Sequence, residues 1–133
     1  MKDSLKFNFT THLGSFKLQA QSEFQNGINA LWGKSGSGKT TFFNSLSGFL
    51  NKIEGEIIFN NKKFFLSSEK INLSPENRNL AYVEQQNMLF NNMNVLKNIE
   101  FGYKFSKQMA KQITPSDAVS LFDLKEYELS SIN

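Results

Sequence analysis

The chain has 133 residues, 39% of them apolar and 20% charged, a composition typical of one globular domain with a modest core. It has no cysteine, which excludes disulfides and thiolate metal sites, and its single histidine, His12, leaves little room for a histidine-based metal site or catalytic dyad. The net charge of +3 is too mild to indicate a nucleic-acid partner, and no apolar run has the length of a membrane span or a signal peptide.

The first half of the chain begins with strand patterns. Residues 5–9 and 16–20 alternate between apolar and polar side chains, and the turn-like residues 12–15 between them predict an antiparallel pair. Residues 28–32 are short and mostly apolar, which predicts a buried parallel strand. Apolar residues then recur at helical spacing from 39 to 50, which predicts a helix with one apolar side.

The sequence pattern in the middle of the chain predicts a hairpin followed by a loop. Residues 56–59 and 63–66 have strand composition, and Asn60-Asn61 between them predicts a tight turn. Residues 67–79 are polar and contain Pro75, so we expect a loop with room for one helical turn. Residues 80–83 predict another short buried strand.

The last third of the chain has helical signals. Asn94 is a good cap for a helix over residues 95–103, and Thr114-Pro115 is a good opening for a last helix. The apolar side of that last helix would contain Ala118, Val119, Leu121 and Phe122. Since β-rich sequence gives way to helical sequence near Gln85, we expect a core over residues 1–86 and the start of a helical part over residues 87–133.

Residues 33–40, GKSGSGKT, fit the phosphate-binding loop pattern of a glycine, four residues, then Gly38-Lys39-Thr40. Glycines let several main-chain amides turn inward and let phosphate oxygens approach, and the helix that follows adds its positive end. Lys39 supplies a charge that can reach the β- and γ-phosphates, and the Thr40 hydroxyl can ligate Mg²⁺. No carboxylate occurs between Glu23 and Glu54, so the loop lies in a stretch that suits a polyanion.

These motifs together resemble the opening of ATP-binding cassette (ABC) transporter ATPases. The resemblance covers nearly the whole chain in order. It rests on the loop with Thr40-Thr41, on Leu46-Ser47-Gly48-Phe49, on the strand Glu54-Gly55-Glu56-Ile57, on Tyr82-Val83-Glu84-Gln85 with Leu89-Phe90 as a Q-loop, and on Val95-Leu96-Lys97-Asn98-Ile99. Within that family, residues 71–78 look closest to the molybdate-importer ATPases, with other oxyanion or metal-ion importers as alternatives.

The resemblance implies an α/β fold of the P-loop NTPase type, with an ABC-type core, antiparallel β hairpins and the start of a helical subdomain. It implies ATP and Mg²⁺ as ligands, with Lys39 and Gln85 as catalytic residues and Thr40 and Gln85 as metal ligands. Gln85 would also sense the γ-phosphate and link it to the helical part. The triphosphate would be held by Gly33, Lys34, Ser35, Gly36, Ser37, Gly38, Lys39, Thr40 and Thr41.

The resemblance also implies partners and a location. Residues 87–103 would face a transmembrane permease subunit, and Met88, Leu89, Phe90 and Met93 could make that contact or form the ordinary core of the helical part. A second copy of the ATPase would complete a homodimer. The protein would be cytoplasmic and peripheral on the inner face of the membrane, coupling ATP binding and hydrolysis to import of a small solute.

Three departures from the family pattern change what we expect. The position of the usual adenine-stacking aromatic is taken by Leu13, for which Phe16 or His12 could substitute, and Glu84 replaces a residue that is commonly apolar or proline. The sequence contains no LSGGQ-like signature, no Walker B strand with its acidic pair and no switch histidine. We therefore expect these 133 residues alone to bind nucleotide weakly and to hydrolyse little.

Two alternatives to an importer ATPase remain. The chain could be a non-catalytic nucleotide-binding remnant or fragment, or a small P-loop kinase. The kinase alternative has less support. No lid segment is visible in the sequence, and a cluster of arginines is missing because Arg78 is the only arginine.

Overall fold

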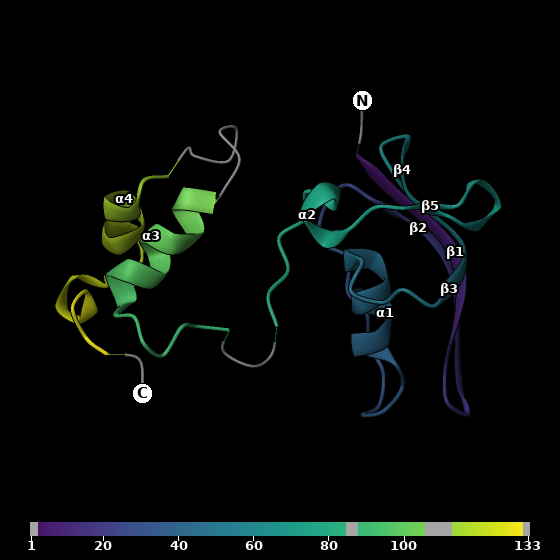
Figure 1. The fold of residues 1–133 in the computed structure, drawn as a ribbon, viewed down its shortest axis with the longest axis horizontal. Coiled ribbons are helices and arrows are strands. Elements are labelled where there is room, and N and C mark those ends of the chain that lie inside the picture. Colours follow the sequence, from purple (N-terminus) through teal and green to yellow (C-terminus); the bar gives the residue numbers. More distant parts are fainter. Residues whose placement is uncertain (1–2, 85–87, 106–112, 132–133) are drawn as a thin grey trace. The chain divides into compact units, whose positions relative to one another are not determined.

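The computed structural model describes residues 3–84, 88–105 and 113–131. The chain forms two compact units, Met1–Tyr82 and Val83–Asn133, which are described here one at a time (Figure 1). The boundary expected between residues 86 and 87 lies outside the described residues, so that division of the chain stays a prediction.

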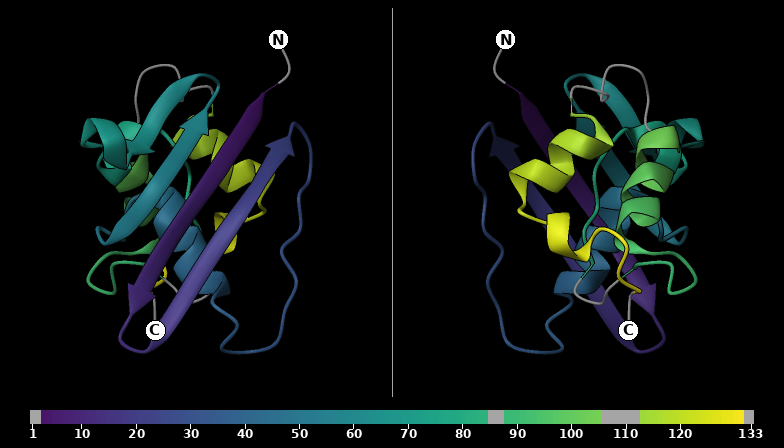
Figure 2. Two further views of the ribbon diagram at one scale, coloured as in Figure 1. Left: turned by 90° about the vertical axis from the view of Figure 1, so that its right-hand side faces the viewer. Right: turned by 90° about the vertical axis from the view of Figure 1, so that its left-hand side faces the viewer.

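The first unit is built on a five-stranded sheet with the order β2-β1-β3-β4-β5, in which all neighbours are antiparallel. Figure 2 shows β1 and β2 as two long strands side by side. The pairing confirms both predicted hairpins, and Asn60 and Asn61 form the second turn with φ of 47° and 64°. The strands are β1 Ser4–Leu13, β2 Phe16–Gln25, β3 Ile53–Phe59, β4 Lys62–Leu66 and β5 Ile71–Asn72.

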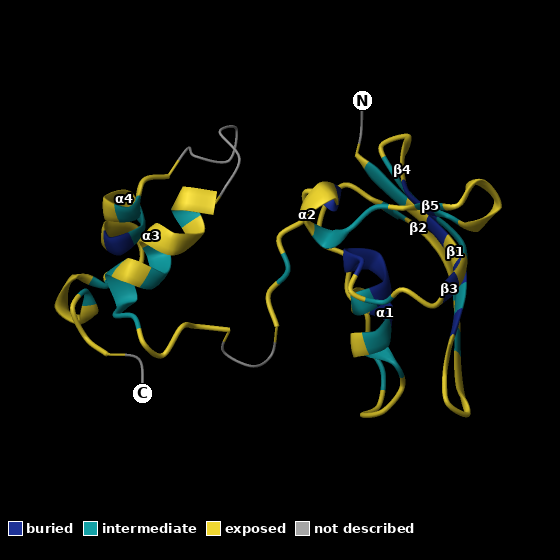
Figure 3. Ribbon diagram, in the orientation of Figure 1, coloured by how far each residue is buried: buried dark blue, intermediate teal, exposed yellow. Residues whose placement is uncertain are grey.

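The predicted helix after the glycine loop is present as α1, Lys39–Ser47, and it packs on one face of the sheet. The ring of Phe42 lies 5.1 Å from that of Phe7 and 6.0 Å from that of Phe9, measured between centroids. Burying such a side chain stabilises the fold by about 1.5–3 kcal/mol. Buried residues lie on α1 and on the sheet (Figure 3), and the buried apolar ones of this unit form one core: Phe7, Phe9, Phe42, Leu46, Ile53, Ile57, Phe64 and Phe65.

Two predictions of buried strands are wrong. Residues 28–32 and 80–83 have no strand structure, and Ile28, Trp32 and Val83 are almost fully exposed, at 103%, 94% and 91%. A strand needs a neighbour that pairs with its backbone, and none of β1–β5 pairs with either segment. An apolar run indicates what a segment can bury, but the described part of the chain supplies no partner for these two.

The loop over residues 67–79 is more ordered than its composition predicts. It contains a short 3₁₀ turn at Ser67–Glu69, the strand β5 and the single helical turn α2, Pro75–Arg78. The expected helical turn is therefore present. β5 pairs with β4 and extends the sheet.

The second unit contains α3, Val95–Phe105, and α4, Pro115–Leu121, followed by a 3₁₀ turn at Lys125–Tyr127. Both predicted helix starts are confirmed, since the Asn94 side chain accepts the Lys97 amide at 2.8 Å and Thr114 begins a capping box.

The expected apolar side of α4 is covered only in part. Val119 is buried, but Leu121 and Phe122 are 65% and 67% exposed. Among the described residues, no helix has both the length and the apolar character needed to cross a bilayer.

Candidate functional site: a phosphate loop at the head of α1

The glycine loop leads directly into the first turn of α1. Gly38 is the residue before the helix, with φ 92° and ψ 13°, and no side chain caps this end. The first turn carries no acidic residue. Helix starts leave amide donors without intrahelical partners and have a positive dipole end, so this end favours an anion.

The main-chain amides of the loop are largely free. Between Lys34 and Thr41, only the Ser37 amide donates to a protein acceptor among the described residues, the Lys34 carbonyl oxygen at 3.2 Å. The first helical hydrogen bond runs from the Phe42 amide to the Gly38 carbonyl oxygen at 2.8 Å. Exposed amides without protein partners are donors that an oxyanion can use.

Lys39 is held across the loop that precedes it. Its Nζ donates to the carbonyl oxygens of Gly33 at 2.7 Å and Lys34 at 2.8 Å. An ammonium has three donors, so one remains for a ligand. Among the described residues neither Lys34 nor Lys39 pairs with a carboxylate, so no described carboxylate neutralises the positive charge of the loop.

The expected metal ligands are only partly described. Thr40 is exposed in the first turn of α1, and its hydroxyl makes no hydrogen bond among the described residues. A free hydroxyl beside free amides fits Mg²⁺, which prefers oxygen ligands and keeps several waters. Thr41, next along the helix, is half-buried and its carbonyl accepts the Ser45 hydroxyl at 2.8 Å. Gln85 lies outside the described residues.

One aromatic side chain reaches the loop from the β1–β2 hairpin. A Cβ built on Gly38 would lie 2.8 Å from Cζ of Phe16 and 3.4 Å from Cδ1 of Leu18, so only glycine fits between the helix and this ring. Of the three candidates for the adenine contact, Phe16 is therefore in contact with the loop. Leu13 pairs with Phe16 at the hairpin tip and is 43% exposed, and His12 is exposed beside it.

Two of the hollows on the first unit differ in the charge of their linings. One of about 510 Å³ is bounded by β2, Trp32 and the loop residues Gly33 and Lys39. This hollow leaves open space beside the glycine loop, with Lys39 in its lining.

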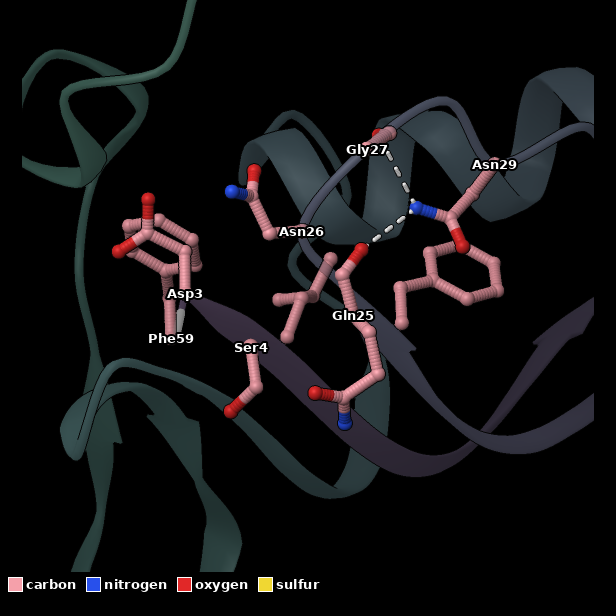
Figure 4. Close-up of a pocket in the computed structure, with 9 residues that line it drawn as sticks. Asp3, Ser4, Gln25, Asn26, Gly27, Asn29 and Phe59 are labelled. Atoms are coloured by element: carbon pink, nitrogen blue, oxygen red, sulfur yellow. Dashed lines mark hydrogen bonds between the residues drawn. The ribbon is translucent and has the colours of Figure 1, made fainter. Parts of the chain in front are cut away.

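The other hollow, of about 300 Å³, lies by the opposite end of the β1–β2 hairpin, where Asp3, Ser4, Gln25 and Asn29 line it (Figure 4). Among the described residues, the one charged group in this second lining is the carboxylate of Asp3, which would repel a triphosphate.

Sequence reasoning missed two side chains that hold the far end of α1. Arg78 is buried and donates to carbonyl oxygens of Ser45 and Leu46, and the Tyr82 hydroxyl donates to Asn44. The only signal in the sequence was that Arg78 is the single arginine, which by itself does not indicate burial.

Comparisons with known proteins add family evidence to this geometry. A family model described as ABC transporter matches residues 20–132. The chain is 35% identical over 123 residues to the molybdenum import ATP-binding protein ModC of Paramagnetospirillum magneticum, covering 88% of the chain and 34% of that protein. It is 34% identical over 122 residues to ModC of Pectobacterium atrosepticum, covering 91% of the chain and 34% of the relative. The chain thus spans about a third of the length of these relatives.

Proposed function

Because the chain belongs to the ABC transporter family, we propose that residues 33–41 bind the triphosphate of ATP in the ATPase subunit of an import system. The observation that carries this proposal is the head of α1, where free main-chain amides, the unpaired charge of Lys39 and the helix dipole converge. A P-loop kinase would use the same loop, but the family match favours the transporter ATPase.

Each part of the loop has its own task in this proposal. The amides between Lys34 and Thr41 that have no protein acceptor donate to phosphate oxygens, which fixes the nucleotide relative to α1. The ammonium of Lys39 uses its remaining donor on the β- and γ-phosphates and offsets their charge. Phosphoryl transfer depends on such positioning and charge neutralisation, so the loop contributes to hydrolysis by holding its substrate.

Thr40 and Gln85 are the proposed holders of Mg²⁺. The free, exposed hydroxyl of Thr40 supports its part, whereas the part of Gln85 rests on the family resemblance of residues 82–85. Held by these side chains, Mg²⁺ would offset the negative charge of the phosphates during transfer. Gln85 is also the proposed sensor of the γ-phosphate. The expectation that these 133 residues alone hydrolyse little stays a prediction.

The transported substrate and the partners are proposed for the whole protein. The relatives named above are molybdenum import proteins, so we assign this chain to an importer of molybdate or a similar oxyanion. A permease that meets residues 87–103 and a second ATPase copy would be its partners, on the inner face of the cell membrane.

The experiment that tests nucleotide binding is a titration of the unsubstituted chain and of Lys39→Ala with a fluorescent ATP analogue in the presence of Mg²⁺. Loss of a charge-assisted phosphate contact should weaken binding at least about tenfold. Lys52→Ala is the matched control, since Lys52 is exposed beyond the end of α1 and the same charge is removed. Equal affinity of Lys39→Ala and the unsubstituted chain, or no binding by either, would reject the proposed function.

A further inference from the structure

Strand β2 forms one edge of the five-stranded sheet, with β1 as its neighbour (Figure 2). It spans ten residues, Phe16–Gln25, and all ten pair with β1 in an unbroken antiparallel register. Among the described residues, no strand pairs with the other side of β2. A long edge of this kind presents main-chain donors and acceptors on which a further strand can pair.

The usual protections of an edge strand are missing from β2. Residues 16–25 contain no proline, and their register with β1 has no bulge. The opposite edge of the sheet is β5, which has only two residues, Ile71–Asn72. Because β2 is the one long edge of this sheet, two copies that pair through it would form a closed dimer and leave no second long edge for a fibre to grow on.

Side chains alternate along β2 between an apolar and a polar face. Leu18, Ala20 and Phe24 are half-buried and pack against the core. The exposed polar residues of the other face are Lys17, Gln19, Gln21, Glu23 and Gln25. A shift of register by one residue turns every side chain of a strand to the other face, so a partner strand that matches both faces has few registers to choose from.

One of these registers makes β2 complementary to itself. When Ala20 lies opposite Ala20 of a second, antiparallel copy, Lys17 lies opposite Glu23 and Gln19 lies opposite Gln21. The two-fold symmetry forms each of these pairs twice. A shift by two residues in either direction places Lys17 opposite a glutamine and removes both charge pairs. Opposite charges that face each other across two strands stabilise the pairing.

The charges of Lys17 and Glu23 are available for this contact. Lys6, which lies opposite Glu23 on β1, forms its ion pair with Glu56 at 3.1 Å. The Glu23 carboxylate accepts the side-chain amide of Gln25 at 2.8 Å. Among the described residues, neither Lys17 nor Glu23 takes part in an ion pair. A second copy would therefore supply each of them with a partner of opposite charge.

The apolar face of β2 supplies a driving force for the same pairing. Leu18, Ala20 and Phe24 line the hollow of about 510 Å³, together with Leu31 and Trp32. Adjacent strands of a sheet share their faces, so a second β2 would add its own three apolar side chains on this side. Removal of this apolar surface from water stabilises the pairing beyond what main-chain hydrogen bonds contribute.

We propose that β2 is a self-association surface, on which two copies of this chain pair antiparallel through residues 16–24 and form one continuous sheet. The proposal does not rest on the proposed function, because the pairing uses the edge of β2 and needs no nucleotide. It is also distinct from the second ATPase copy proposed above, whose association belongs to the working transporter.

The first test measures the mass of the full 133-residue chain by sedimentation over a range of concentrations, without nucleotide. The unsubstituted chain should pass from monomer to dimer as its concentration rises. Lys17→Glu should weaken the dimer at least about tenfold, because two attractive charge pairs become repulsive. Lys17→Glu combined with Glu23→Lys exchanges the two charges and should restore most of the affinity. Lys125→Glu, at an exposed lysine of the second unit, is the control and should leave the dimer unchanged.

A second test reads the register directly, and the absence of cysteine from the sequence makes it simple. In Ala20→Cys, the two substituted positions face each other with Cα atoms about 4.5–5.5 Å apart, which suits a disulfide. In Ser22→Cys, on the same face, the two positions are about 13 Å apart along the strands. Mild oxidation should therefore join Ala20→Cys into a covalent dimer much faster than Ser22→Cys.

Four results would overturn this inference. The first is an unsubstituted chain that stays monomeric at every concentration or associates only with ATP. The second is a dimer that Lys17→Glu leaves unchanged or that the exchanged pair does not restore. The third is equal cross-linking of Ala20→Cys and Ser22→Cys, and the fourth is open-ended association into larger species. The Lys39→Ala titration judges nucleotide binding separately, so either proposal can fail without the other.

Discussion

The guanidinium of Arg78 lies 2.7 Å from the carbonyl oxygen of Leu46, although the two residues are 32 positions apart in the chain. A helix end is more often satisfied by a glycine motif and water or by a nearby cation. Here the glycine motif at Gly48 and a distant buried arginine act on the same turn, so the end of α1 depends on a long-range contact. The stability of the first unit should therefore be sensitive to this one side chain.

Arg78→Met should destabilise the first unit by at least about 2 kcal/mol, because the carbonyls of Ser45, Leu46 and Leu73 lose their buried donor. The loss of stability in Arg78→Lys should be smaller than in Arg78→Met, since an ammonium keeps the positive charge but lacks the planar set of donors of a guanidinium. Urea unfolding followed by circular dichroism measures the change. Lys52→Met, at an exposed lysine beyond the end of α1, controls for loss of surface charge. A midpoint equal to that of the control would contradict the structural role.

Phe16 should contribute to binding of the base of ATP but not of the phosphates. Its ring contacts Gly38 at the head of α1 and is 36% exposed, so one side of the ring remains open to a ligand. Phe16→Ala should weaken ATP by roughly three- to tenfold, the magnitude expected for one aromatic contact, and leave inorganic tripolyphosphate unchanged.

Competition of both ligands against a fluorescent ATP analogue separates these two effects. Leu13→Ala, at the neighbouring hairpin position, is the control and should change neither affinity. Equal weakening of ATP and tripolyphosphate by Phe16→Ala would assign the ring to support of the loop instead.

The start of α4 should lose stability in acid. The Thr114 hydroxyl, at 2.6 Å, and then the Thr114 amide, at 2.9 Å, hold the pKa of Asp117 below its ordinary value of 3.8. A carboxylate with a lowered pKa stabilises the folded state above the unfolded pKa, and this contribution disappears as pH falls through the folded pKa. The charge also favours the helix start through the dipole.

Circular dichroism from about pH 6 to pH 2 measures the helix content of the unsubstituted chain and of Asp117→Asn. The unsubstituted chain should be more helical at the upper end, and the two curves should meet below the folded pKa of Asp117. Parallel curves over the whole range would show that the capping box does not depend on ionisation of Asp117.

Turns and helix starts could be predicted closely from sequence. Asn60-Asn61, Asn94 and Thr114 were expected at turns or caps and are found there, because each acts through hydrogen bonds within a few residues. The glycine loop belongs to the same class, since residues 33–40 carry their own backbone signal and lead into the helix they predict.

Local sequence signals do not show whether a segment pairs as a strand. The runs over residues 28–32 and 80–83 have strand composition, yet neither forms a strand, because pairing requires a neighbour that the segment itself does not encode. β5, within a stretch expected to be loop, pairs with β4 because a suitable edge lies beside it. Burial of Arg78 likewise depends on carbonyls far away in the chain.

The sequence by itself therefore determined the glycine loop before α1, the hairpin turns and the helix caps, since these features depend on bonds between residues close together in the chain. Only the tertiary structure decided that Phe16 contacts Gly38, and that Arg78 and Tyr82 fasten residues 78–82 to α1. These contacts join residues 22 to 38 positions apart, and they form only when the hairpin, the helix and the loop fold against the same core.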